Sequence, residues 1–207
     1  MIRDFCITLY FERGCANIVK YYSDEENEKE IHYCTQKNTG RNNKMTKEEL
    51  LDKVLSSYRA YYDVNTETPE EPFAAEAVFH SHSDAYFLVK GATLGEAESN
   101  EYVFFALEDK LDKERMLRLD QEAWERGISR VKPHANHRNT DISLVVLASS
   151  MTEETEKTVR SLKHYKNYRM SLQGFSHYHL IVVDLSSGKK TCNRQGRSLK
   201  KLFDKIY

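Results

Sequence analysis

The sequence lacks a long hydrophobic run, a paired cysteine motif and an excess of charge of either sign. No stretch approaches the roughly 20 apolar residues of a membrane-spanning helix. Arg3 and Asp4 place charge at the start of the chain, so we expect no signal peptide. The four cysteines form no Cys-x-x-Cys pair: Cys6, Cys15, Cys34 and Cys192. These absences predict a soluble cytoplasmic protein with free thiols and no membrane contact.

The charges nearly balance, but they are unevenly distributed. The chain has 31 Lys and Arg residues against 32 Asp and Glu residues, a net charge of −1 that implies no acidic or basic partner. Residues 186–207, however, carry seven basic side chains and one acidic side chain, Asp204. Such a cluster attracts phosphates or acidic protein surfaces, or is simply the solvated face of a helix and a hairpin.

Capping motifs and apolar runs predict the secondary structure from residue 46 onward. Thr46 and Glu49 form a capping box that starts a helix, which we expect to end near Asp63. The stretch 142–148 (Ile-Ser-Leu-Val-Val-Leu-Ala) lacks polar alternation, which is typical of a strand buried on both faces, and Ser150 then predicts a second helix cap. Other strands are expected at 74–80, 85–90, 102–107, 168–172, 178–185 and 189–193, and other helices at 111–130 and 197–206.

The order of these elements predicts the fold class. Helices alternate with strands, which favours an α/β fold (or α+β) with a single mixed sheet and helices packed on its faces. A chain of 207 residues buries roughly 70% of its unfolded surface and needs no metal or disulfide to fold. We expect residues 45–207 to form this domain and residues 1–44 to form an N-terminal appendage or small subdomain.

Histidines are concentrated in the second two-thirds of the chain and include two His-x-His pairs. His80 and His82, like His177 and His179, alternate on predicted strands, so each pair points to one face of the sheet. A zinc site needs three or four ligands at about 2.0–2.1 Å. Across a hairpin, Glu101 approaches the first pair, which makes His80, His82 and Glu101 candidate metal ligands. The alternative is that these are ordinary surface or partly buried histidines.

A Glu-x-Lys motif follows the apolar strand at 102–107. Glu108 and Lys110 form it, and Asp84 lies upstream near the start of another predicted strand. In Asp…Glu-x-Lys nucleases two acidic groups bind Mg²⁺ and the lysine helps to position or activate the attacking water. The order α-β-β-β-α-β matches the core of those enzymes. The alternative is that the motif merely precedes the next helix, with Asp112 as its cap.

Basic and aromatic residues interleave in the C-terminal third of the chain. Cations neutralise phosphates and aromatic rings stack on bases, so this composition is typical of a surface for single-stranded nucleic acid. The aromatic members are Tyr165, Tyr168, Phe175 and Tyr178. The predicted contact residues are Lys163, Lys166, Arg169, Lys189, Lys190, Arg194, Arg197, Lys200 and Lys201.

Several short segments between residues 79 and 202 resemble an uncharacterised bacterial domain family. They are His82 with 86–90, and the stretches 100–104, 174–176, 183–188 and 193–196. The resemblance implies no activity, cofactor or partner.

Two functions from different classes stay open. The leading hypothesis is a non-enzymatic binding module without a cofactor, which contacts nucleic acid or an acidic protein surface through its basic C-terminal third. It predicts a contiguous positive patch. The alternative is a Mg²⁺-dependent phosphodiesterase, which requires Asp84, Glu108 and Lys110 to meet within about 8 Å on one rim of the sheet.

Overall fold

A computed structural model describes residues 45–86 and 93–207, with the backbone alone at 81–86 and 93–97. The predicted N-terminal appendage lies outside these residues. Within them, seven strands form one mixed sheet that packs against four helices, so the predicted α/β fold is confirmed. None of the helices in this part of the chain is long and apolar enough to cross a membrane.

The strands have the spatial order β1-β2-β3-β4-β6-β5, and β7 also pairs with β6. β3, β4 and β6 are parallel neighbours, because α2 and α3 lie in the connections between them, and the other pairs are antiparallel. The elements are α1 (Lys47–Tyr58), β1 (Asp63–Asn65), β2 (Ala75–Tyr86), β3 (Thr93–Leu111), α2 (Lys113–Ser129), β4 (His137–Met151), α3 (Glu153–Ser161), β5 (Tyr165–Asn167), β6 (Phe175–Asp184), β7 (Lys189–Cys192) and α4 (Arg197–Ile206).

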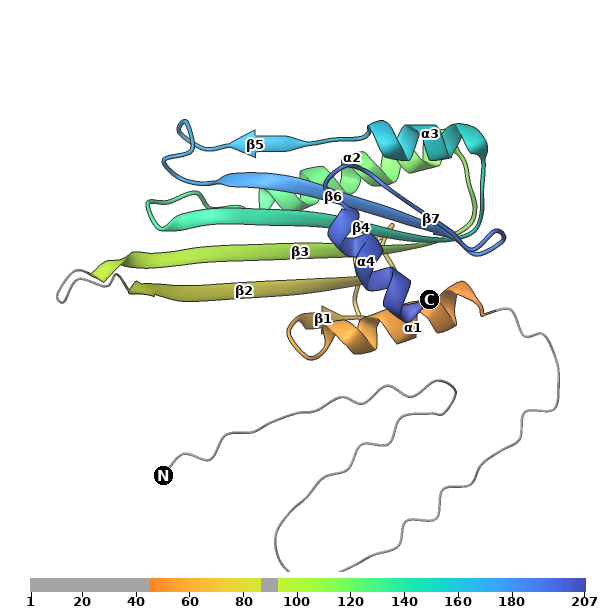
Figure 1. Ribbon diagram of the computed structural model, residues 1–207, viewed down its shortest axis with the longest axis horizontal. Coiled ribbons are helices and arrows are strands. Elements are labelled where there is room, and N and C mark those ends of the chain that lie inside the picture. The colour runs from red at the N-terminus through yellow and green to blue at the C-terminus, as the bar shows by residue number, and fades with distance from the viewer. Residues whose placement is uncertain (1–44, 87–92) are drawn as a thin grey trace, which may run out of the picture. The chain divides into compact units, whose positions relative to one another are not determined.

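Two hydrophobic cores lie on the two faces of the sheet. α1 and α4 pack on the front face, with α4 crossing in front of the strands in Figure 1, and α2 and α3 pack on the back face. Side chains of β4 alternate between them, with Val145 and Leu147 in the front core and Leu144 and Val146 in the back core. Because both of its faces are buried, this strand lacks the polar alternation of a half-exposed strand, and the single polar side chain between residues 142 and 148, Ser143, is itself buried.

The front core covers only one end of the sheet. Toward the carboxyl ends of the parallel strands the front face is apolar, as at Phe105 and Val145. Toward their amino ends the same face carries Glu101, Asp141 and His177, which lie side by side in the strand register. This change from apolar to polar side chains places a polar surface directly beside the front core.

Helix α1 begins as predicted and ends earlier. Thr46 accepts the Glu49 N–H at 3.1 Å, and the Glu49 carboxylate accepts the Thr46 N–H at 2.9 Å, so the capping box is confirmed. The helix ends at Tyr58, and the N–H groups of Tyr61 and Tyr62 then both bond to its carbonyl oxygen. This turn brings three tyrosines together at the end of α1.

Two strand boundaries differ from the predictions because backbone pairing outweighs local sequence preference, and one predicted strand is a turn. β2 continues through the polar stretch 81–84, whose residues all pair with β3. β4 includes Ser150, so Thr152 caps α3 instead and accepts the Thr155 N–H. The predicted strand 168–172 is a turn, whose three central residues have left-handed φ angles of 48°, 54° and 68°.

Candidate ligand-binding pocket

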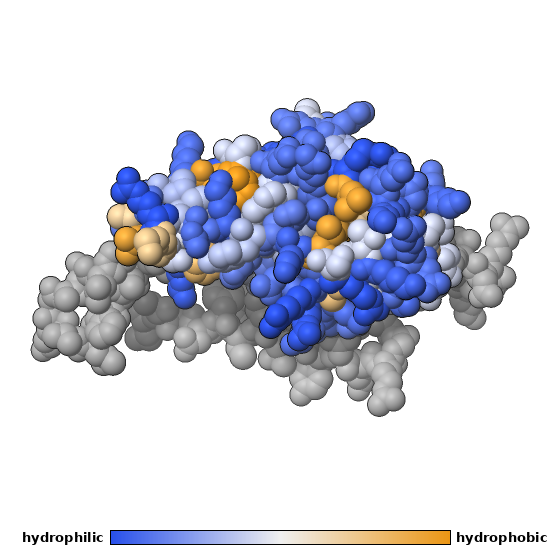
Figure 2. Space-filling model, turned by 90° about the horizontal axis from the view of Figure 1, so that it is seen from above, coloured by the Kyte–Doolittle hydropathy of each residue, from blue (hydrophilic) through white to orange (hydrophobic). Residues whose placement is uncertain are grey.

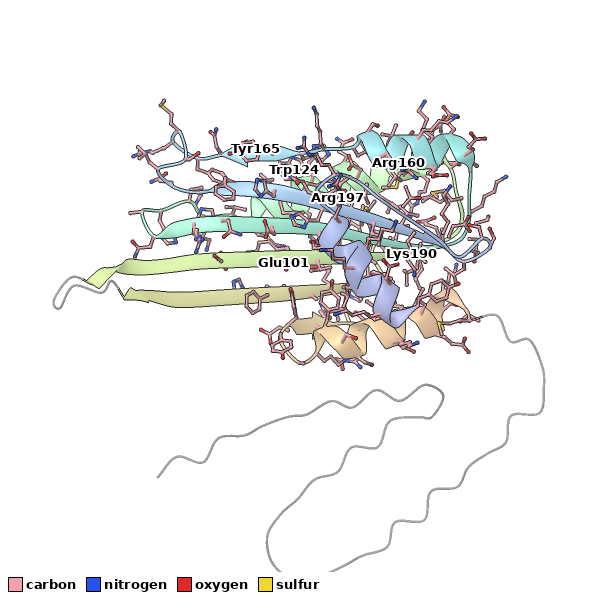
Figure 3. The ribbon with its side chains drawn as sticks, in the orientation of Figure 1. Glu101, Trp124, Arg160, Tyr165, Lys190 and Arg197 are labelled. Atoms are coloured by element: carbon pink, nitrogen blue, oxygen red, sulfur yellow. The ribbon has the colours of Figure 1, made fainter. Side chains whose placement is uncertain are left out.

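A pocket of about 440 Å³ opens on the front face between α1, α4 and the sheet. Its floor consists of Glu101 on β3, Asp141 on β4 and His179 on β6. Figure 3 marks Glu101 on the strand beside α4. The volume falls within the range of about 300–1,000 Å³ that is typical of small-molecule sites.

Aromatic side chains from the end of α1 form one wall of the pocket. Tyr58, Tyr61 and Tyr62 line it together with Ser57. The rings of Tyr58 and Tyr62 meet edge to face, with centroids 4.8 Å apart, whereas Tyr61 is 77% exposed. The wall therefore has a packed inner part and an open outer ring.

The opposite wall belongs to α4. Ser198, Leu199 and Leu202 line it, a spacing that places them on one side of the helix. Arg197, which Figure 3 marks at the start of α4, is not a lining residue. Among the described residues that line the pocket there is no Lys or Arg.

Glu101 is a partly buried carboxylate held by two neutral donors. The Tyr62 hydroxyl donates to its Oε2 at 2.6 Å, and the Ser143 hydroxyl donates to its Oε1 at 2.8 Å. Burial, followed by the negative charge of Glu101, raises the pKa of Tyr62, so this phenol keeps its proton and stays a donor. In the described part of the chain no Lys or Arg forms an ion pair with Glu101.

Asp141 lies next to Glu101 in the parallel register of β3 and β4. Its Oδ1 is 3.9 Å from Nε2 of His179 and 4.0 Å from Nδ1 of His177, and its Oδ2 accepts the Asn139 amide at 3.4 Å. Its side chain is 29% exposed. Two carboxylates thus share one face of neighbouring strands, with histidines rather than permanent cations beside them.

The structure separates the predicted metal ligands. Glu101 pairs with Phe79 in the strand register, and its side chain points to the front face. His80 pairs with Asn100 instead, and its Nδ1 lies 2.6 Å from the Asn100 Oδ1, within hydrogen-bond distance. The side chain of His82 lies outside the described residues. Within those residues no group of three His, Cys, Asp or Glu side chains converges as a metal site.

The residues of the nuclease alternative are also far apart along the strands. The side chain of Asp84 lies outside the described residues, but its backbone pairs with Glu96. The distance along β3 from Glu96 to Glu108 is on the order of 40 Å, since a strand rises about 3.3 Å per residue. Glu108 forms an ion pair with Arg115 at 2.8 Å, and Lys110 is exposed. The structure does not bring Asp84, Glu108 and Lys110 to one rim.

The nine predicted basic contact residues are distributed over β7, the region around β5, and the region on or before α4. Lys189 and Lys190 already form ion pairs, with Glu156 at 2.7 Å and with Asp204 at 3.1 Å. The remaining members are exposed, and Lys166 points to the back face because it pairs with Ser176. Those on or before α4 are Arg194, Arg197, Lys200 and Lys201, and those around β5 are Lys163, Lys166 and Arg169.

The surface seen from the β5 and α3 side is mostly hydrophilic, with separate hydrophobic patches (Figure 2). Met170 and Leu172, in the turn between β5 and β6, are 90% and 79% exposed. Exposed apolar side chains are thus scattered on this side. In the front pocket, by contrast, aromatic and apolar walls lie beside charged side chains.

A second titratable cluster, not anticipated from the sequence, lies on the back face. Asp120 of α2 is buried, and its Oδ2 is 2.7 Å from Nε2 of His164. The ring of Trp124 stacks on His164 at 5.0 Å, and Tyr178 meets it edge-on at 4.9 Å. Burial, followed by the charge of Asp120, raises the pKa of Tyr178 well above its ordinary value. The cluster connects α2 to the segment before β5.

Sequence reasoning identified one pocket residue as a candidate, Glu101, and assigned it to a different site. His177 and His179 were expected to point to one face of the sheet, and the register confirms this, because both lie on the front face. Tyr58 and Tyr62 resembled ordinary members of a helix stripe. Asp141 lies inside β4, directly before the apolar stretch that starts at residue 142, and a charged residue at that position is the signal that the sequence offers.

Comparison with known proteins identifies the family. The model of a domain of unknown function, DUF8052, matches residues 46–205. The chain belongs to this family. The match confirms the expected uncharacterised family over a longer stretch than 79–202, and every residue that lines the pocket lies in the DUF8052 domain. No curated protein and no solved structure matches the chain significantly.

Proposed function

We propose that the DUF8052 domain of this protein is a binding module whose front pocket takes a positively charged organic group. The observation that carries this proposal is the pair of neighbouring carboxylates, Glu101 and Asp141, on the floor of a tyrosine-walled pocket. The two carboxylates lie in neighbouring strands, and the described lining supplies no Lys or Arg to balance them.

The charge of the floor favours a cation over an anion. At about 5 Å and an effective dielectric constant of about 20, one carboxylate attracts a unit positive charge by about 3 kcal/mol, and solvent exposure lowers this value. Both oxygens of Glu101 already accept hydroxyl hydrogen bonds. Glu101 therefore offers negative charge more than free acceptor positions, which suits an alkylated ammonium group that has few or no N–H donors.

The tyrosine wall supports the same class of ligand. Cations bind over the faces of aromatic rings with about 0.5–2 kcal/mol each, and a cage of rings beside a carboxylate is a common arrangement for quaternary ammonium groups. Tyr61 is exposed enough to turn toward a ligand, whereas Tyr58 is packed in the front core. The wall thus combines a fixed ring with an adjustable ring.

Titration of the isotopically labelled protein with tetramethylammonium tests the proposal. We expect saturable shifts in the NMR spectrum at the end of α1, at α4 and at Glu101, with no such shifts from acetate. Glu101→Gln keeps a group that can accept from Tyr62 or Ser143 and removes the charge. We expect it to weaken binding about tenfold, or about 1.4 kcal/mol.

Glu153→Gln is the matched control, because it makes the same change on α3, where the side chain is 82% exposed. It should leave the affinity unchanged. Thermal unfolding of both variants establishes that they are folded. The proposal is abandoned if tetramethylammonium shows no saturable binding, or if both variants bind it as well as the wild-type protein does.

A second candidate function rests on α4. Arg197, Lys200 and Lys201 are exposed at helical spacing, and in the described part of the chain none forms an ion pair. They support a contact with an acidic partner, the narrower form of the basic surface expected from the sequence. A single-stranded DNA oligonucleotide should bind with a salt-dependent affinity that Arg197→Glu with Lys201→Glu abolishes. Unchanged binding by that double variant would remove this candidate.

A further inference from the structure

Three aromatic rings lie next to one another on the part of the front face that extends beyond the front core. We call Tyr165, Phe175 and His177 the aromatic platform. The centroids of Phe175 and His177 are 4.8 Å apart, those of Tyr165 and His177 are 5.3 Å apart, and those of Tyr165 and Phe175 are 6.4 Å apart. Tyr165 is 56% exposed, and none of the three belongs to either hydrophobic core. Core packing therefore does not account for their arrangement.

The aromatic platform is continuous with the pocket. In the strand register Glu101, Asp141, His177 and Tyr165 form one row across β3, β4, β6 and β5. Figure 3 marks the two ends of this row, Glu101 and Tyr165. With about 4.8 Å between neighbouring strands, the row is roughly 14 Å long. A ligand whose cationic group lies at Glu101 and Asp141 can therefore reach the platform with a second group attached through a short linker.

The charges around the platform favour an electron-poor or cationic partner over a nucleic acid. Asp141 lies 4.0 Å from the His177 ring. Lys166, the basic residue within β5, points to the opposite face, and its ammonium lies 5.5 Å from the Tyr168 ring. Single-stranded nucleic acid requires cations along its phosphates beside the stacking rings. Here the charged group that the structure records beside a platform ring is the Asp141 carboxylate, next to His177.

We infer that the ligand of the front pocket carries a planar aromatic ring as well as a cationic nitrogen, and that the aromatic platform stacks on that ring. The ligand class is an aromatic amine or an aromatic quaternary ammonium compound. This inference rests on the proposed function, because the cation holds one end of the ligand at Glu101 and Asp141. The platform then determines which cations bind most tightly.

Two probes with the same charge test the inference. Butyltrimethylammonium and (4-phenylbutyl)trimethylammonium differ by one phenyl ring. A stacked aromatic pair stabilises a complex enough to tighten binding roughly 2- to 10-fold beyond simple area burial. We expect the phenyl compound to bind about tenfold more tightly to the wild-type protein, as measured by calorimetry or NMR titration.

The variants separate the platform from general hydrophobicity. Tyr165→Ala and, independently, Phe175→Ala should reduce the advantage of the phenyl compound to about two- to threefold, with the affinity for butyltrimethylammonium unchanged. Leu117→Ala is the matched control, since it removes a 41% exposed apolar side chain from α2 on the other side of the sheet. It should leave both affinities unchanged. Thermal unfolding shows which variants are folded, and Tyr165 is exposed enough that its replacement should be tolerated.

The outcomes distinguish this inference from the proposed function. If butyltrimethylammonium does not bind, the proposed function fails and this inference fails with it. If it binds and the phenyl compound binds no more tightly, only the inference fails. It also fails if both platform variants keep the full advantage of the phenyl compound. If the wild-type protein binds an oligonucleotide and the Tyr165→Ala variant does not, the platform binds nucleic acid instead.

Discussion

Gly127 provides a direct test of how closely α2 packs on the sheet. It lies inside α2, although a glycine in a helical sequence often marks an end. A Cβ at this position would lie 2.7–2.8 Å from three side-chain carbons of Ile142 on β4, namely Cγ1, Cγ2 and Cδ1. The close approach of helix to strand, rather than a need for a special backbone angle, explains the glycine.

The effect of Gly127→Ala is the difference between two opposing terms. Alanine is better than glycine in a helix by about 1 kcal/mol. Forcing a methyl group into a packed core costs about 1–3 kcal/mol. We expect the variant to lower the free energy of unfolding by about 1 kcal/mol, which corresponds to roughly 2–4 °C in Tm for a domain of this size. Urea unfolding, followed by the fluorescence of the single tryptophan, Trp124, measures it.

A double-mutant cycle separates the two terms. Ile142→Ala removes all three carbons that the new methyl group would meet, at a cost of about 2–5 kcal/mol by itself. In that background only the higher helix propensity of alanine remains, so Gly127→Ala should stabilise the protein by about 1 kcal/mol. The sign of the effect therefore reverses. The steric explanation would be refuted by a Gly127→Ala variant that stabilises the wild-type protein, or by equal destabilisation in both backgrounds.

Three other predictions concern stability. Burial raises the pKa of Asp184, but hydrogen bonds from Ser186 and Ser187 lower it by more, so the pKa in the folded protein lies below its ordinary value. The charged form therefore stabilises the fold above about pH 4, and this contribution is lost as the pH falls further. Asp184→Asn should cost about 1 kcal/mol at pH 7, and the difference from wild type should shrink in unfolding experiments below about pH 4. Glu76→Gln should cost about 2 kcal/mol in urea unfolding, because this buried carboxylate lies 2.8 Å and 3.5 Å from two arginines; a change below 0.5 kcal/mol would contradict it. Gly174→Ala should lower Tm by several degrees, since Gly174 has φ +78° and a Cβ would meet backbone oxygens at 2.5–2.6 Å; an unchanged Tm would show that the turn can rearrange.

Local signals in the sequence determined much of the fold. The Thr46 capping box started α1 where the structure has it, because the cap depends on two side chains three residues apart. The largely apolar run at 142–148 identified the central strand, because a strand buried on both faces shows no polar alternation. Where a boundary depended on pairing with a distant strand, as for β2 and Ser150, the sequence pattern was misleading.

Only the tertiary structure decided which side chains share a site. Strand register placed Glu101 beside Asp141, forty residues later in the chain, and directed His80 to the other face, because neighbouring residues on a strand point in opposite directions. The turn after α1 and the packing of α4 then enclosed these carboxylates with Tyr62 and its neighbours. The sequence by itself determined a mixed α/β domain with polar strand ends, and long-range pairing, which no local pattern encodes, decided that those ends line a pocket.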